Sequence, residues 1–252
     1  MHKAFQQFQG EISVSQNQRV GGLAIGIVVI DVWYPMLPGN VANASTYRFP
    51  VTYKVLRGAT IEQILQGDPV LKNLIIEVGK ELIETHGVRA VVGACGSFAN
   101  YKSDVAAALS VPVFMSVMLQ VPMILRSLKP TGKLGIVAAA KKALTRRVFE
   151  ECGITDASRL VIEEVKDLPE FHNLLQCGGR FNTSRLEDQV VDLATQMVTR
   201  NPEIRGLLIQ CSDLPPYASA IQNATGLPVF DMNGLVEWVY HATVRQPYIG
   251  FV

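Results

Sequence analysis

Two cysteines stand in similar surroundings at two places in the chain. Cys95 follows the uncharged run AVVGA, and Cys211 follows the run GLLIQ. Runs of small, apolar and β-branched residues are typical of buried parallel strands. In open parallel sheets, ligands bind beyond the carboxyl ends of the strands, where loops lead into the next helices. Each thiol is therefore expected at a sheet edge where a substrate can bind.

Both cysteines belong to a longer repeat. A tyrosine stands six residues after each of them, at Tyr101 and Tyr217, and the tripeptide Pro-Val-Phe occurs at 112–114 and again at 228–230. All these agreements keep one offset of 116 residues. A common register of this length predicts a duplicated α/β unit with one cysteine in each half.

Two thiols allow proton transfer at carbon. A thiolate is both a base and a nucleophile, and the pKa of a thiol falls from about 8.5 when it lies at a helix amino terminus, which is the setting we expect here. Two thiols on opposite faces of a stereogenic carbon can remove one proton and return another. The carbanion is stabilised when its charge spreads onto a bound carboxylate or carbonyl. Such chemistry requires neither a metal nor an organic cofactor.

Strands and helices are expected to alternate along the chain, which predicts parallel sheets joined by right-handed crossovers. Strands are expected at 23–30, 51–56, 111–117, 133–139, 159–165 and 227–231, and in the runs that end at Cys95 and Cys211. Helices are expected near 60–67, 70–86, 103–109, 121–128, 144–152, 169–176, 184–200, 216–225 and 234–243. The loop at 31–50 interrupts this pattern, and a loop of that length in a compact domain is more often functional than idle.

The segment KPTG at 129–132 is the best candidate for a linker. We therefore expect two pseudo-symmetric three-layer α/β/α domains with parallel sheets, at 1–130 and 131–234, with 235–252 packing back on the first half. Two such halves facing each other bring the carboxyl ends of both sheets to one interdomain cleft. The active site is expected in that cleft.

Composition limits the partners and the location. The formal net charge is +1, charged residues make up 18%, and no block of like charge occurs, so neither nucleic acid nor a membrane surface is expected as a partner. The apolar run at 21–30 is too short to span a membrane, which takes about 20 residues. No signal-peptide order precedes it, so we expect a cytoplasmic protein. Cys152 and Cys177 have no counterpart in the repeat, and the four cysteines show no zinc-ligand spacing.

The segments GACGS and QCSDLPPY, on a duplicated α/β frame of this size, resemble the aspartate/glutamate racemase superfamily, which includes hydantoin racemases, maleate isomerases and arylmalonate decarboxylases. The resemblance covers nearly the whole chain. It implies cofactor-independent proton transfer with Cys95 and Cys211 as the acid/base pair, and a homodimer or higher oligomer. Amino-acid racemases of the group show Cys-Asn-Thr and Cys-Thr, whereas Gly96 after the first cysteine is closer to hydantoin racemases.

The same resemblance implies that Ser97 and Ser212 hold the substrate carboxylate. Six residues are expected to contact a small carboxylate or carbonyl substrate: Gly96, Ser97, Ser212 and Asp213 beside the thiols, and Asn43 and Thr46 from the loop at 31–50. Plainer interpretations exist for these residues and for the two cysteines. Serine and aspartate commonly cap helices, loop residues such as Asn43 and Thr46 commonly belong to a solvated turn, and free cysteine is often a buried core residue. For Asp213, orienting a thiol and capping a helix are equally plausible roles.

The function expected from these observations is a PLP-independent racemase or epimerase, an isomerase that moves a proton at the carbon alpha to a carboxylate or carbonyl of an amino acid, hydantoin or related small acid. Three alternatives stay open. Two are enzymes, a maleate-type cis–trans isomerase and an arylmalonate-type decarboxylase. The third is a non-catalytic protein that binds a small acid.

Overall fold

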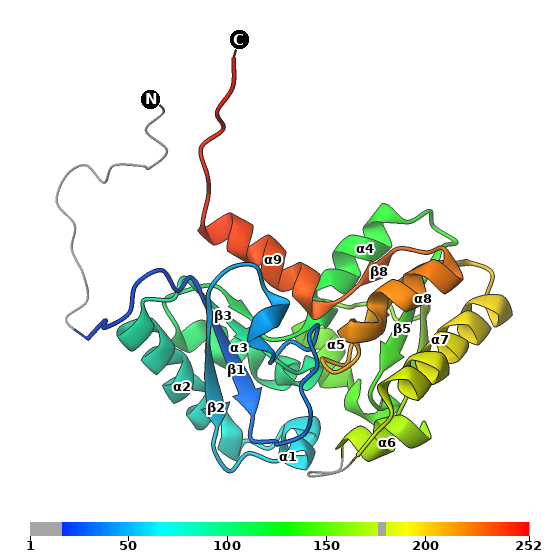
Figure 1. The fold of residues 1–252 in the computed structure, drawn as a ribbon, viewed down its shortest axis with the longest axis horizontal. Helices are drawn as coiled ribbons and strands as arrows, with labels where there is room; N and C mark the ends of the chain where they lie inside the picture. The colour runs from blue at the N-terminus through cyan, green and yellow to red at the C-terminus, as the bar shows by residue number, and fades with distance from the viewer. Residues whose placement is uncertain (1–16, 176–179, 252) are drawn as a thin grey trace.

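Two parallel sheets of the same strand order form the frame of the molecule (Figure 1). The computed structural model describes residues 17–175 and 180–251. Its first sheet has the order β2-β1-β3-β4 and its second the order β6-β5-β7-β8, with every neighbouring pair parallel. The two-domain α/β architecture with parallel sheets that the sequence predicts is confirmed.

The strands follow the predicted repeat. The first sheet contains β1 (Ile25–Ile30), β2 (Val51–Leu56), β3 (Ala90–Gly93) and β4 (Val113–Phe114). The second contains β5 (Lys133–Ala138), β6 (Leu160–Glu164), β7 (Ile204–Ile209) and β8 (Val229–Phe230). The ends of β3 and β7 are 116 residues apart, and so are those of β4 and β8, which is the offset of the cysteine repeat. The expected strand at 111–117 is reduced to the two residues of β4.

Each helix expected from the sequence is present. The α-helices are α1 (Ile61–Gln66), α2 (Val70–His86), α3 (Lys102–Ala108), α4 (Val121–Ser127), α5 (Arg146–Glu151), α6 (Pro169–Leu175), α7 (Thr183–Arg200), α8 (Ala218–Thr225) and α9 (Met232–Thr243). Short 3-10 helices lie in the connections: η1 (Ala44–Thr46), η2 (Gly96–Tyr101), η3 (Val117–Gln120), η4 (Lys141–Ala143) and η5 (Pro215–Tyr217). A capping box between Thr60 and Gln63 explains why α1 begins where it does.

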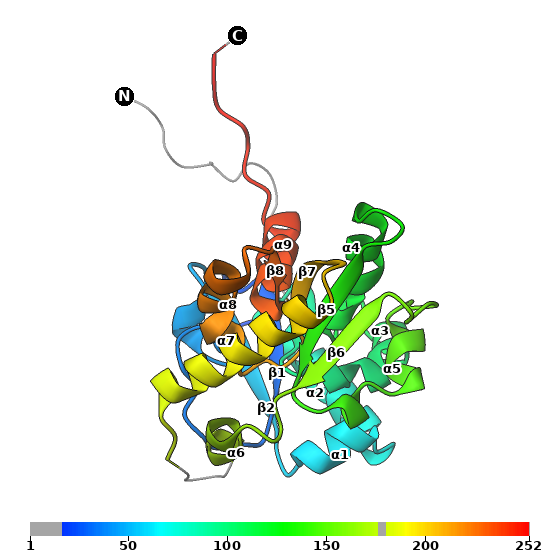
Figure 2. The ribbon, with the colours of Figure 1, turned by 90° about the vertical axis from the view of Figure 1, so that its right-hand side faces the viewer.

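Each half has three layers, a sheet between two layers of helices, because alternate side chains of its strands face opposite sides of the sheet. In β5, Leu134 and Ile136 belong to the core beneath α4 and α5, whereas Val137 belongs to the core beneath α6, α7 and α8. Neighbouring residues of a strand point to opposite faces, so helices cover both faces of the sheet (Figure 2). In the first half, Val28 of β1 packs with α2 and α3, and Ile27 faces the core shared with the second half.

The last helix returns to the first half. Helix α9 contacts β3 and η3, and its buried Val236 belongs to the same core as Ile27 of β1. The segment after α9 extends away from the body, where Tyr248, Ile249 and Phe251 are exposed (Figure 1). Within residues 17–175 and 180–251, no helix combines the length and apolar character needed to cross a membrane. Residues 1–16 and Cys177 lie outside the described residues.

Candidate active site

A cavity of about 280 Å³ between the two halves contains both predicted thiols. Cys95 lies two residues beyond the end of β3, and Cys211 lies two residues beyond the end of β7. The parallel strands thus deliver one thiol from each sheet to a shared wall, as expected for ligand sites at the carboxyl ends of strands. Cys95 is partly exposed to the cavity, and Cys211 is 7% exposed.

A buried carboxylate stands beside the second thiol. Asp213 lines the cavity and accepts a hydrogen bond from the Sγ of Cys211 at 3.6 Å. Its Oδ1 accepts a second hydrogen bond from Nδ2 of Asn40 at 2.7 Å. The hydroxyl of Tyr34 lies 3.2 and 3.1 Å from its two oxygens. Because Tyr34 and Asn40 come from the loop at 31–50, the first half holds the carboxylate of the second.

Burial sets the protonation of these groups. It raises the pKa of Asp213, while hydrogen bonds from Asn40 and Tyr34 act in the opposite direction. Burial, and then the charge of Asp213, raise the pKa of the Cys211 thiol well above its ordinary value. Burial also raises the pKa of Cys95 to about 11, although the backbone N–H of Ser97 opposes this.

The expectation of a lowered thiol pKa is therefore wrong. The apolar cavity disfavours the thiolate by more than the nearby N–H groups stabilise it. Moreover, Cys95 precedes the 3-10 helix η2 instead of the amino terminus of an α-helix. Burial thus favours the protonated form of both free thiols, so a base or a bound cation is needed to generate a thiolate.

The residues predicted to flank the thiols also line the cavity. Gly96, Ser97 and Ser212 all do so. Ser97 is 1% exposed, and its hydroxyl is close enough to the Cys95 thiol to lower the pKa of that thiol. Across the described part of the chain, its Oγ is nevertheless the one buried side-chain oxygen or nitrogen without a well-formed hydrogen bond. It caps no helix, because the residue that precedes η2 is Cys95. An unpartnered buried hydroxyl on a cavity wall is suited to a ligand.

Asn43 and Thr46 are placed differently from the prediction. Neither lines the cavity. Nδ2 of Asn43 donates to the carbonyl of Met36 at 2.7 Å, and its Oδ1 accepts from the backbone of Ser45. Oγ1 of Thr46 donates to the carbonyl of Asn40 at 2.8 Å. Both side chains thus form hydrogen bonds within the loop, and the one from Thr46 helps to fix the backbone of Asn40.

The loop at 31–50 is fastened to the second half at several points. The backbone N–H of Val41 donates to the carbonyl of Ser212 at 3.4 Å, and Nδ2 of Asn233 donates to the carbonyl of Gly39 at 2.6 Å. Gly39 has a φ of 99°, and a Cβ at this position would lie 2.9 Å from Cα of Pro216. Only glycine fits both the backbone conformation and this close approach.

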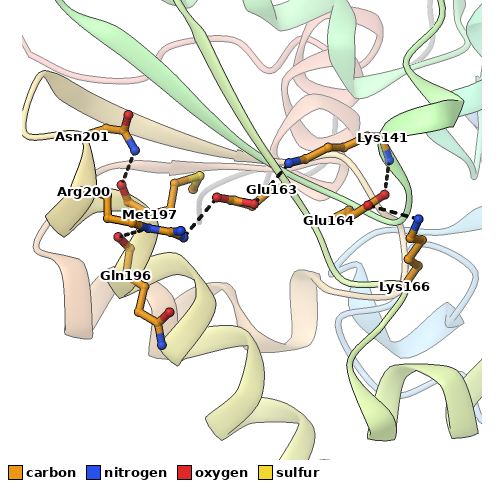
Figure 3. A network of polar contacts seen from close by, with 8 residues as sticks. All are labelled: Lys141, Glu163, Glu164, Lys166, Gln196, Met197, Arg200 and Asn201. Atoms are coloured by element: carbon orange, nitrogen blue, oxygen red, sulfur yellow. Dashed lines mark hydrogen bonds and ion pairs between the residues drawn. The ribbon is translucent and has the colours of Figure 1, made fainter.

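Several cavity residues were not predicted from the sequence, namely Tyr34, Asn40, Lys142, Lys166, Phe171 and Gln210. The first two belong to the loop at 31–50, which the sequence did mark as functional. Lys166 is paired with Glu164 at 3.2 Å, and Glu164 accepts a hydrogen bond from the backbone N–H of Lys141 at 2.7 Å (Figure 3). This network holds the segment that carries the cavity-lining Lys142.

The offset of 116 residues also reveals a difference between the halves. It relates Ser97 in the first half to Asp213 in the second, each two residues after its cysteine. Only the second thiol therefore has a carboxylate at this position. Across the described residues, no group of three or more His, Cys, Asp or Glu side chains is placed to hold a metal ion.

Solved structures share this fold at low sequence identity. The glutamate racemase isoform of Bacillus anthracis superposes with a TM-score of 0.55 at 16% identity, covering 87% of this chain and 82% of that one. The allantoin racemase of Pseudomonas fluorescens gives 0.56 at 13% identity, covering 90% and 100%, and unliganded arylmalonate decarboxylase gives 0.54 at 13% identity, covering 89% and 94%. The chain has the fold of the aspartate/glutamate racemase superfamily.

Sequence relatives indicate another chemistry. The chain is 29% identical over 236 residues to dimethylsulfoniopropionate lyase 5 of Emiliania huxleyi (strain CCMP1516), covering 90% of this chain and 47% of that protein. It is 27% identical over 233 residues to the dimethylsulfoniopropionate lyase of Durusdinium sp. clade D, covering 90% and 77%. The chain thus spans about half the length of the Emiliania relative. No model of a known protein family matches it.

These relatives correct the functional expectation. They are named lyases, so the prediction of a racemase or epimerase, and with it the isomerase class, is wrong. The hydantoin-racemase branch is likewise not the branch to which the sequence relatives point. The two cysteine segments led to the right fold, because their positions in the sequence follow from the duplicated frame. They led to the wrong reaction, because proteins with the same frame catalyse different reactions.

Proposed function

We propose that this chain is a lyase that cleaves the carbon–sulfur bond of dimethylsulfoniopropionate or of a closely similar β-substituted propionate. The observation that carries the proposal is the match to the named lyases over 90% of the chain. A continuous match of that length leaves at most a tenth of the chain outside it, so it spans both cysteine segments and the cavity wall between them.

The reaction needs one base and a site for an anion. In dimethylsulfoniopropionate, a sulfonium group is attached to the carbon β to a carboxylate. When a base removes a proton from the α carbon, the α and β carbons form a double bond and the carbon–sulfur electron pair leaves with the sulfur. The products are acrylate and uncharged dimethyl sulfide, and the proton stays on the base. No acid is needed for the leaving group.

The contact between Cys211 and Asp213 favours Cys211 as that base. Its thiol already donates to the carboxylate at 3.6 Å. Transfer of the thiol proton to Asp213 generates a thiolate without changing the net charge of the cavity. Burial raises the pKa of Asp213, which makes this carboxylate a better proton acceptor than an exposed one. The thiolate then removes the α proton of the substrate.

The cavity suits both ends of such a substrate. The unpartnered hydroxyl of Ser97 and the backbone N–H groups near it are donors for the carboxylate. The aromatic rings of Tyr34 and Phe171 line the same cavity, and aromatic faces attract cations such as a sulfonium group. A bound cation also favours a thiolate in an apolar site, which offsets the raised pKa of the free thiols.

The direct test is incubation of the purified chain with dimethylsulfoniopropionate. We expect the vinyl protons of acrylate in the proton NMR spectrum and an equal amount of dimethyl sulfide in the headspace. The control is the Cys211→Ser variant at the same concentration, which should release both products at least about a hundredfold more slowly. The proposal would be rejected if the folded native chain left the substrate unchanged at every pH from 6 to 9.

A further inference from the structure

Gln210 is a buried polar residue that stands directly before Cys211. It is 4% exposed and lines the cavity. Its backbone N–H donates to the carbonyl of Val137 at 2.9 Å, which ties it to β5. Its side-chain Oε1 faces the backbone N–H of Ala139 at 3.4 Å. With the oxygen of the amide directed to Ala139, the amide nitrogen is left for another partner.

That nitrogen lies against the first half. A Cβ built on Gly96 would lie 2.2 Å from Nε2 of Gln210 and 2.8 Å from its Cδ. Gly96 stands between Cys95 and Ser97, so the amide of the second half packs onto the cysteine segment of the first. A side chain at position 96 would displace this amide. Glycine at position 96 therefore lets the Gln210 amide keep this place.

Two donors at this place have no protein acceptor. Across residues 17–175 and 180–251, Oγ of Ser97 is buried without a hydrogen-bond partner, which is rare in folded proteins. Nε2 of Gln210 makes no hydrogen bond to these residues either, but it is not fully buried and belongs to a residue of the cavity wall. The two groups come from opposite halves and flank the same glycine. A ligand with two acceptor oxygens can satisfy both.

We propose that the side-chain amide of Gln210 and the hydroxyl of Ser97 together bind the substrate carboxylate, one donor from each half. The identity of the substrate rests on the proposed function, but the anion site does not depend on turnover. Charge spreads onto the carboxylate as the α proton leaves, so hydrogen bonds from these donors strengthen during the reaction. Gln210 is then a catalytic residue as well as a binding residue.

Alkylation of the thiols tests the site without requiring lyase activity. Iodoacetate carries a carboxylate and iodoacetamide does not, so the ratio of their rates at Cys95 and Cys211 reports an anion site beside the thiols. The variant Gln210→Met keeps the volume and removes the donor, and Gln210→Glu replaces the donor with a negative charge. Gln222→Glu on the exposed surface of α8 makes the same charge change away from the cavity. Peptide mass spectrometry assigns each product.

We expect the iodoacetate-to-iodoacetamide ratio to fall about 10- to 100-fold in Gln210→Met, since a hydrogen bond to a charged group is lost, and further in Gln210→Glu. Gln222→Glu should keep the native ratio. An unchanged ratio in a folded Gln210→Met would overturn the proposal. If the ratio falls although dimethylsulfoniopropionate is not cleaved, the anion site stands and the proposed lyase function fails.

Gly96 supplies a second, independent measurement. Gly96→Ala should lower the same ratio in the native background, because the new Cβ pushes the Gln210 amide aside. In a Gln210→Ala background the amide is already absent, so Gly96→Ala should then have a much smaller effect, since only the contact of its Cβ with the backbone oxygen of residue 210, at 3.0 Å, remains. Equal losses in both backgrounds would show that Gly96 acts independently of Gln210 and would contradict the assignment.

Discussion

The thiol of Cys211 lies 3.6 Å from Oδ2 of Asp213, two residues further along the chain. This contact distinguishes the two cysteines of the cavity, since the residue two positions after Cys95 is Ser97. A thiol with its own proton acceptor can become a thiolate inside an apolar site. A thiol without such an acceptor, such as Cys95, can lose its proton only to the solvent or when a bound ligand's charge stabilises the thiolate.

Removal of the two thiols should have unequal effects. Cys211→Ser should lower the rate of dimethyl sulfide release by about 10²- to 10⁴-fold, the usual loss when a general base is removed. Cys95→Ser should cost about tenfold or less, because this thiol is not the base. Cys152→Ser removes a buried thiol from the core and should retain activity. Headspace gas chromatography measures all three, and equal losses at positions 95 and 211 would indicate that both thiols are required.

The pH dependence should change with Asp213. In the native chain, activity should fall as the pH drops through the raised pKa of Asp213, because the protonated carboxyl cannot accept the thiol proton. In Asp213→Asn, burial still raises the pKa of Cys211, so kcat/KM should be low at neutral pH and increase about tenfold per pH unit. Profiles from pH 5 to pH 10 compare the two. Profiles of the same shape would remove Asp213 from the mechanism.

Tyr34→Phe should shift the acid limb of this profile. The hydroxyl of Tyr34 stabilises the ionised form of Asp213, so its loss should raise the pKa of Asp213 further. Activity should then begin to fall at a higher pH, with a reduction of about tenfold near neutrality. Tyr101→Phe is the control, since its hydroxyl bonds to the carbonyl of Asp68 outside the cavity. An unmoved acid limb would show that the Tyr34 hydroxyl does not tune Asp213.

Gly39→Ala should destabilise the chain and weaken the site together. A left-handed backbone costs a non-glycine residue about 1–2 kcal/mol, and here the new Cβ also meets Pro216. Gly58→Ala is the matched control, with a φ of 80° and no atom within 4 Å of its Cβ. Urea unfolding should show the larger loss for Gly39→Ala, and only this variant should lose activity. If Gly39→Ala and Gly58→Ala lost the same stability and both kept full activity, the loop at 31–50 would be shown to tolerate a shift away from Pro216.

Periodicity and turn residues were sufficient to predict the frame. The apolar spacing at 70–86 gave α2 with its observed end, and the register of the two cysteine segments placed both thiols beyond β3 and β7. These features are local, or they repeat along the chain, so a single sequence contains them. The shorter β4 and the 3-10 helices depend on packing between distant segments, which periodicity does not report.

The cavity was only partly predictable for the same reason. Ser97 and Asp213 were found because they adjoin the cysteines. The loop at 31–50 was singled out by its length, yet the sequence does not show that Asn40 faces the cavity while Asn43 bonds within the loop. Gln210 adjoins a cysteine too, but its importance depends on the missing side chain at Gly96, more than a hundred residues earlier.

The pairing of Ser97 with Asp213 across the repeat bears on how many proton carriers the cavity provides. A reversible exchange at one carbon calls for two matched proton carriers, since each must be able to start the reaction from its own side. A frame built by duplication supplies matched positions by default, and a difference at one of them is enough to remove that balance. With a hydroxyl in one half and a carboxylate in the other, the two sides of this cavity are no longer interchangeable. Such an asymmetry fits an elimination, in which one group removes a proton and no second group has to return one to the same carbon.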